Sequence, residues 1–147
     1  MRNRWMGAAV CALLCLAAAA GAQSGPCTLR VHVDGFRNQK GDLRVAVFKT
    51  PAGWPEPEER AFFHSGFAIN GKESSAQLSL PPGRYAVVVL HDENQNQKLD
   101  RNFLNVPKEG FGFSNNPRVM LTAPGFDTAA FEVACPATDV QIHLIYK

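Results

Sequence analysis

The chain has 147 residues, of which 46% are hydrophobic and 19% are charged, with 12 glycines and 10 prolines. That length suits one domain, and the composition excludes a disordered tail, a collagen and a coiled coil. Outside residues 1–22 the chain carries 13 basic and 13 acidic residues. A neutral body argues against a nucleic-acid partner and against docking on anionic membranes through basic patches.

The N-terminal segment has the three parts of an export signal. Residues 1–4 include two arginines, residues 5–20 form an apolar run, and residues 20–22 provide an A-x-A cleavage site. The run is short for a transmembrane helix and ends in small residues, as a signal peptide does, although an uncleaved anchor is the alternative. We expect a signal peptide at 1–22 and one domain at 23–147, periplasmic or secreted, with no membrane insertion after cleavage.

Two cysteines, Cys27 and Cys135, remain after the signal is removed. In an exported chain two cysteines most simply form one disulfide, whereas a redox-active pair would have C-x-x-C spacing. The bridge would close a loop long enough to stabilise the fold by up to about 4–5 kcal/mol in the chain-entropy model. We therefore expect a structural disulfide between Cys27 and Cys135.

Segments of alternating apolar and polar residues recur along the mature chain. Residues 29–33, 43–47 and 76–80 alternate, which predicts half-buried strands, and residues 38–41 supply a hairpin turn between the first two. Residues 85–90 are apolar on both faces, which predicts a central strand. Further elements are expected as a loop at 51–57, a short helical turn at 58–64, and strands at 118–121, 128–133 and 140–145.

About seven strands joined by Gly/Pro turns indicate an all-β fold, a single antiparallel Greek-key β-sandwich. Cys27 and Cys135 would then join the beginnings of the first and last strands. The exception is the stretch 91–117, which is polar and glycine-rich and has no strand pattern of its own. Loops this long are uncommon in compact domains and are usually functional or disordered, so any chemistry is expected here.

The first part of this loop has calcium-ligand spacing. Oxygen side chains recur at Asp92, Asn94, Asn96 and Asp100, and the backbone carbonyl of Lys98 takes the seventh position of an EF-hand-like loop. Calcium prefers six to eight oxygens, and alternate residues on a tight curl direct them toward one point. The pattern predicts a structural calcium ion as the cofactor.

Two departures make the predicted calcium site weak. Gln97 stands where the sharp turn prefers glycine, and Phe103 stands where a bidentate glutamate is expected, so Asn102 or Glu109 would have to complete the shell. The alternative is a loop whose Asx side chains hydrogen-bond their own backbone.

The second part of the loop places Phe111 and Phe113 between glycines. The two rings either form an exposed platform for a ligand or fold over the end of the sandwich as a plug. We expect a protein or small-ligand partner at the 103–117 loop.

Three segments together resemble a known family. Leu80-Pro-Pro-Gly-Arg-Tyr-Ala-Val, then the run from His91 to Asp100, then the run from Pro107 to Asn116 are similar to an uncharacterised family of exported bacterial proteins. The resemblance implies export and a sandwich similar in outline to transthyretin. Members of that family usually have glycine at the positions of Gln95 or Gln97. The resemblance implies no established activity.

Three functions remain open. The first is an exported β-sandwich binding or accessory module of unknown ligand, and the second is an envelope-associated structural protein without a small ligand. The third is an enzyme of unrecognised type centred on His91, Asp92 and Glu109. No G-x-S-x-G, H-E-x-x-H or phosphate-binding glycine loop occurs, so we do not expect an enzyme. If their strands are neighbours, His32 and His143 are candidates for binding a transition metal; the alternative, which we favour, is that both are solvated strand residues.

Overall fold

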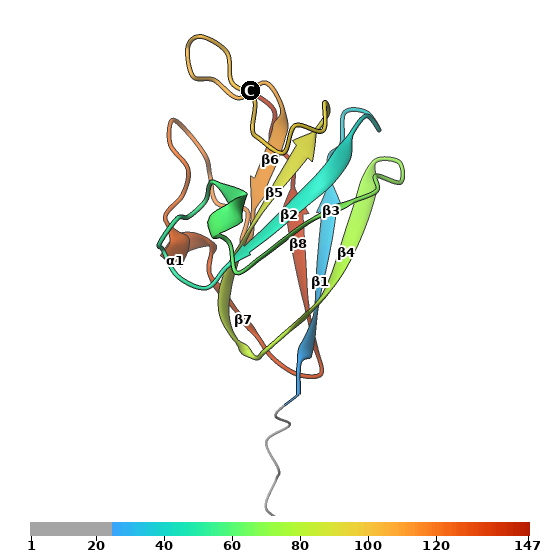
Figure 1. The fold of residues 1–147 in the computed structure, drawn as a ribbon, viewed down its shortest axis with the longest axis vertical. Coiled ribbons are helices and arrows are strands. Elements are labelled where there is room, and N and C mark those ends of the chain that lie inside the picture. The colour runs from blue at the N-terminus through green and yellow to red at the C-terminus, as the bar shows by residue number, and fades with distance from the viewer. Residues whose placement is uncertain (1–24) are drawn as a thin grey trace, which may run out of the picture.

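The computed structural model describes residues 25–147, and the predicted signal peptide at 1–22 lies outside them. The described chain forms eight strands, one 3-10 turn and one short helix, arranged in two sheets (Figure 1). The elements are β1 (Cys27–Asp34), β2 (Asp42–Phe48), η1 (Glu58–Arg60), β3 (Phe63–Phe67), β4 (Glu73–Leu80), β5 (Gly83–Asp92), β6 (Gly110–Phe113), α1 (Phe126–Ala129), β7 (Phe131–Val133) and β8 (Ala137–His143). None of the described residues forms a helix with the length and hydropathy needed to cross a bilayer.

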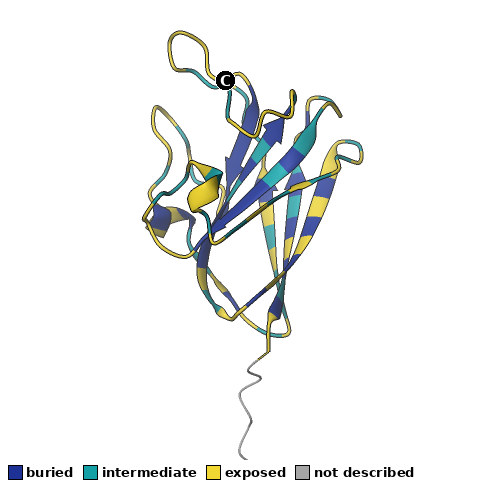
Figure 2. Cartoon of the chain, in the orientation of Figure 1, coloured by how far each residue is buried: buried dark blue, intermediate teal, exposed yellow. Residues whose placement is uncertain are grey.

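The two sheets face each other across an apolar core. Sheet one has the order β4-β1-β8, and sheet two has the order β3-β2-β5-β6, with β7 pairing with the first residues of β5. Alternate residues of β1, Leu29, Val31 and Val33, are at most 1% exposed between the sheets. Figure 2 shows the matching alternation of buried and exposed residues along β4. The predicted all-β sandwich is confirmed.

One pair of strands departs from the antiparallel rule. β1 and β8 run parallel, while the other strand pairs are antiparallel. The disulfide between Cys27 and Cys135, with 4.7 Å between the Cα atoms, joins these two strands at their shared beginning. Because the chain enters β8 beside the start of β1, the two strands must leave that end in the same direction.

Four predicted strands are confirmed, but the hairpin is wrong. Residues 29–33, 43–47 and 76–80 lie in β1, β2 and β4, and residues 85–90 lie in β5, which has neighbours on both sides. β1 pairs with β4 and β8, whereas β2 pairs with β3 and β5, so residues 38–41 cross between the sheets. A turn signal fixes where a chain reverses and leaves open which strands pair.

The loop predicted at 51–57 is confirmed, whereas the expectations for four other segments need correction. The strand predicted at 118–121 is a loop in which Met120 and Leu121 are exposed. The turn predicted at 58–64 is limited to η1, because Phe63 already begins β3. In the segment predicted as a strand at 128–133, α1 occupies the first part and β7 only the end. The last strand, β8, covers 137–143 and begins earlier than the predicted 140–145.

A strand also lies inside the segment predicted to have none. Residues Gly110 to Phe113 form β6, which pairs with β5. Glycine is required on its inner side, because a Cβ at Gly110 would lie 2.5 Å from Cζ of Tyr146 and one at Gly112 would lie 2.7 Å from Cγ2 of Ile142. The alternation of glycine inward and phenylalanine outward is a strand period, although its composition is that of a loop.

Candidate functional site

The outer face of sheet two is apolar. On β5, Ala86, Val88 and Leu90 alternate with the core residues, and β6 adds Phe111 and Phe113 on the same outer side. A central strand that is apolar on both faces needs cover on both faces. Sheet one covers the inner face, so the loops have to cover the outer one.

Trp54 covers one half of this outer face. Its ring lies 5.4, 5.7 and 6.0 Å from the rings of Phe48, Phe113 and Phe126, and its indole N–H donates to the carbonyl of Pro124 at 2.8 Å. Ala86 beneath this cluster is fully buried. The aromatic cluster therefore closes the outer face near the start of β5.

A groove remains over the other half. Its volume is about 700 Å³, and its floor includes Val88, Leu90, Phe111 and Phe113. Both Val88 and Leu90 are only half-buried, although they belong to a central strand. Three segments form the walls, within residues 55–59, 97–107 and 119–123. The volume falls within the range of about 300–1,000 Å³ that is usual for small-molecule sites.

The walls carry opposite charges. Glu56, Glu58 and Glu59 line one side, and Lys98 and Arg101 line another. An ion pair between Arg101 and Glu56 joins these two walls across the groove. The groove is thus apolar at its floor, and its walls are held together by a partly exposed salt bridge.

Arg44, on the outer face of β2, adds a second ion pair to the groove lining. Its guanidinium pairs with Glu58, and the hydrogen bond to that carboxylate raises the pKa of Arg44. Burial raises the pKa of the neighbouring Asp42, against the opposing charge of Arg44. One carboxylate oxygen of Asp42 is buried without a hydrogen-bond partner in the described part of the chain.

The loop predicted to hold calcium is closed by its own hydrogen bonds. The two carboxylate oxygens of Asp92 accept the backbone N–H groups of Asn96 at 3.1 Å and Gln97 at 2.7 Å. The side-chain amides of Asn94 and Asn96 donate to the carboxylate of Asp100 at 2.7 and 2.9 Å. The structure therefore brings the predicted side chains together around hydrogen bonds, as in the Asx-loop alternative.

The side-chain oxygens that the calcium prediction assigns to the ion accept hydrogen bonds in the described chain. Amide nitrogens, not oxygens, face Asp100, and the backbone N–H of Lys98 donates to the side chain of Asn96 at 2.9 Å. Among residues 25–147, no three His, Cys, Asp or Glu side chains are grouped to hold a metal ion. Gln95 and Gln97 have φ angles of 59° and 63°, in the left-handed region that glycine enters without strain.

The residues of the enzyme hypothesis are all buried but do not bond to one another. His91 and Asp92 are 0% exposed and Glu109 is 4% exposed. The carboxylate of Glu109 accepts the backbone N–H groups of Glu93 and Asp100, both at 3.0 Å. Burial raises the pKa of Glu109, and these two hydrogen bonds oppose that rise. Glu109 therefore holds both ends of the 92–100 loop by hydrogen bonds.

His91 also bonds outside the proposed trio. Its Nε2 lies 2.8 Å from the carbonyl of Lys40, and its Nδ1 lies 2.7 Å from the hydroxyl of Tyr146. Since a carbonyl only accepts, the network assigns the proton to Nε2 and makes Tyr146 the donor to Nδ1. The Tyr146 hydroxyl also accepts the backbone N–H of Arg37 at 3.3 Å. The imidazole thus connects β5, the crossover after β1 and the C-terminal segment.

His32 and His143 lie on neighbouring strands, as the metal alternative required, but each bonds to a different carboxylate. His32 lies 3.0 Å from Oδ1 of Asp139, and His143 lies 2.6 Å from Oδ1 of Asp34. All four side chains are on the exposed face of sheet one. They form a polar ladder on a solvated surface, in line with the solvated-strand alternative.

The comparisons with known proteins give one family. Residues 31–141 match the family described as "Uncharacterized protein conserved in bacteria (DUF2141)". The chain belongs to this family. The match includes the groove floor, the 92–100 loop and most of the walls. No curated protein and no solved structure gives a significant match, so the transthyretin likeness of this family member stays a prediction.

The groove floor is the feature that sequence reasoning missed. The signal was present, because residues 85–90 are apolar on both faces. What the sequence did not show is that Trp54 covers only part of the outer face. Phe111 and Phe113, expected either as an exposed platform or as a plug, are 5% and 4% exposed and lie in the groove floor.

Proposed function

We propose that this chain is an exported binding module whose ligand is apolar and occupies the groove of sheet two. Val88 and Leu90, which are only half-buried on a central strand and line the groove, carry the proposal. Each Å² of apolar surface that a ligand removes from water contributes roughly 25 cal/mol. A ligand that covers the floor therefore supplies the burial that the loops leave incomplete.

We favour binding over catalysis because of how the titratable groups near the groove are used. The floor of the groove is apolar, and in its walls Glu56 and Glu58 form ion pairs with Arg101 and Arg44. Asp92 and Glu109 lie outside the groove lining, and each holds two backbone N–H groups. A general acid or base must be within hydrogen-bond reach of the substrate atom that exchanges a proton. The groove suits an apolar molecule held by contact area.

The test uses N-phenyl-1-naphthylamine, a neutral apolar dye that fluoresces when it leaves water. We expect saturable binding by the purified protein. Val88→Trp, which fills the floor, should weaken binding by about tenfold or more, equivalent to roughly 1.4 kcal/mol. Leu104→Asp, at a rim position that is 67% exposed, changes the groove with little effect on folding and should also weaken binding.

The control is Gln77→Trp, which adds the same ring to the exposed face of sheet one. The proposal is wrong if Val88→Trp and Leu104→Asp bind the dye as tightly as the parent protein. It is equally wrong if Gln77→Trp weakens binding as much as they do, because the dye would then be reporting general surface binding.

The calcium ion predicted for residues 92–100 stays a separate proposal, supported by the sequence spacing alone. A thermal melt with and without several millimolar calcium tests it, with Asp92→Ala/Asp100→Ala as the control. A calcium-selective rise in Tm that the double variant loses is the expected result, because an ion that binds only the folded state stabilises it. No rise would leave the loop as a hydrogen-bonded scaffold.

A further inference from the structure

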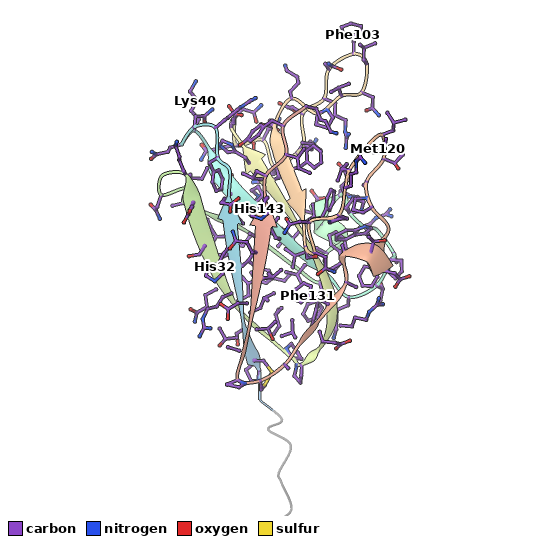
Figure 3. All side chains as sticks on the ribbon, turned by 180° about the vertical axis from the view of Figure 1, so that it is seen from behind. His32, Lys40, Phe103, Met120, Phe131 and His143 are labelled. Atoms are coloured by element: carbon purple, nitrogen blue, oxygen red, sulfur yellow. A yellow bond between two sulfur atoms is a disulfide. The ribbon has the colours of Figure 1, made fainter. Side chains whose placement is uncertain are left out.

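Two loop tips at the mouth of the groove expose large apolar side chains. Phe103 is 94% exposed and Leu104 is 67% exposed on one tip, and Met120 is 67% and Leu121 is 99% exposed on the other. Leu104, Met120 and Leu121 also line the groove. Figure 3 shows Phe103 and Met120 at the end of the sandwich away from the start of β1. Several large apolar side chains exposed together at one end of a domain mark an interaction site more often than a single exposed one does.

The first tip is built to project. The side-chain oxygen of Asn102 accepts the backbone N–H groups of Leu104 at 2.9 Å and Val106 at 3.0 Å. The backbone N–H of Asn102 donates to the carbonyl of Val106 at 2.9 Å. Asn105 closes the turn in the left-handed region, with φ of 61°. Phe103 is therefore held outward by an ordered turn.

The two segments that carry the tips also carry basic side chains. Lys98, Arg101, Lys108 and Arg118 are exposed in the segments that carry the tips. Among the acidic residues nearby, Asp100 accepts the amides of two asparagines and Glu109 is 4% exposed. On the facing wall of the groove, Glu56 pairs with Arg101 and Glu58 pairs with Arg44. In the described chain this leaves Lys98, Lys108 and Arg118 as exposed cations without an ion pair, against the single exposed Glu59 on the facing wall, so the unpaired charge at this end is mainly positive.

We propose that the protein docks on an anionic lipid surface through Phe103, Leu104, Met120 and Leu121, with the groove mouth facing the acyl chains. Separate convex tips suit a fluid interface, whereas a stable protein interface buries a continuous patch of roughly 800 Å² on each partner. The basic residues around the tips complement anionic headgroups. That an acyl chain then enters the groove rests on the proposed function; the docking itself does not.

The test is flotation of the purified protein with vesicles of phosphatidylcholine, with or without about 30% phosphatidylglycerol as the anionic lipid. We expect binding to the mixed vesicles, at least about tenfold weaker binding to phosphatidylcholine alone, and weakening by salt. Phe103→Asp and Leu121→Asp should each weaken binding by about tenfold or more, because each places a negative charge among the headgroups. Both positions are exposed, so neither change disturbs the core.

The matched control is Ser79→Asp, which adds the same charge to the exposed face of sheet one and should leave vesicle binding unchanged. Val88→Trp separates ligand binding in the groove from docking on lipid, because it fills the groove and leaves the tips intact. Docking is overturned if no vesicle binds the protein, or if Phe103→Asp binds vesicles like the parent. If vesicles are not bound while the tip variants lose a protein partner, the tips form a protein interface and the lipid proposal is wrong.

Discussion

The outer faces of the two sheets differ in how much cover they need from the rest of the chain. On sheet one, β4 alternates strictly between buried and exposed residues, and its outward side chains are small and polar, such as Ser75 and Gln77. On sheet two, β5 turns Ala86, Val88 and Leu90 outward. The outer face of sheet one is polar and needs no cover in water. The outer face of sheet two needs cover, and the loops between β2 and β3 and between β5 and β7 supply it only in part.

The proposed binding function gives this difference a reason. A polar outer face on β5 would have made the sandwich self-sufficient, as it is in sheet one. The apolar face needs long loops over it and leaves Val88 and Leu90 only half-buried. The proposed binding site would explain why such a face is present, and stability measurements on both faces show how far they differ.

The largest difference in stability between the two faces should follow from removing the aromatic side chain that covers sheet two. Trp54→Ala deletes the ring that packs on Phe48, Phe113 and Phe126. Since replacing a packed Trp by Ala typically removes about 3–5 kcal/mol, and Trp54 is only half-buried, we expect a loss of about 3 kcal/mol in the free energy of unfolding. Urea denaturation measures it. His32→Ala on the exposed face of sheet one should change stability by no more than about 0.5 kcal/mol. Equal losses in both variants would remove the distinction between the faces.

A smaller loss in the free energy of unfolding is expected when the hydrogen bonds that hold the 92–100 loop are weakened. In Glu109→Gln only the side-chain carbonyl still accepts, so one of the N–H groups of Glu93 and Asp100 loses its partner. An unsatisfied buried donor costs about 1–3 kcal/mol, and we expect a loss of about 2 kcal/mol in urea denaturation. Glu73→Gln, at an exposed position of sheet one, is the matched control. A loss no greater than that of the control would mean that Glu109 does not hold the loop.

The smallest expected effect is a change in how folding stability depends on pH. Burial acts to raise the pKa of Glu93, but hydrogen bonds from Asn38 and Arg37 outweigh it, so the pKa lies below its usual 4.5. A carboxyl with a lowered pKa stabilises the fold above its usual pKa, and that contribution disappears as the pH falls through the lowered value. Glu93→Gln should therefore flatten the acid side of the stability curve below about pH 4.5, by less than about 1 kcal/mol because the partner Arg37 is exposed.

The control for the pH prediction lies on sheet one. A hydrogen bond from His32 lowers the pKa of Asp139, which is fully exposed. Asp139→Asn should therefore change the acid side of the curve less than Glu93→Gln does. Thermal melts of both variants between pH 2 and pH 6, roughly the range in which carboxyls titrate, make the comparison. A larger effect from Asp139→Asn would reverse the ranking of the two faces.

The pattern of apolar and polar residues alone was enough to predict four of the strands. β1, β2 and β4 alternate, and β5 is apolar throughout, so burial imposes a pattern on the sequence that can be read without a structure. The disulfide followed from the count of two cysteines in the predicted mature chain.

Contacts between distant segments could not be predicted in the same way. β6 has a loop composition because Tyr146 and Ile142, more than 25 residues further on, exclude side chains from Gly110 and Gly112. The pairing of β1 with β8 and the partial cover of the groove are likewise set by tertiary packing. The Asx residues of the 92–100 loop fit a metal and a hydrogen-bonded turn equally well until their partners are known.

The two ends of the described chain have different neighbours, and this matters for anyone who handles the protein. Cys27 begins β1 at the end of the sandwich opposite the loop tips, while the C-terminus lies beside the groove, whose lining includes Lys147 (Figure 1). A purification tag or a surface linker attached after Lys147 would crowd the groove mouth and compete with the proposed ligand. The same attachment placed ahead of Cys27 would leave the mouth open, so N-terminal immobilisation is the format in which binding should be screened.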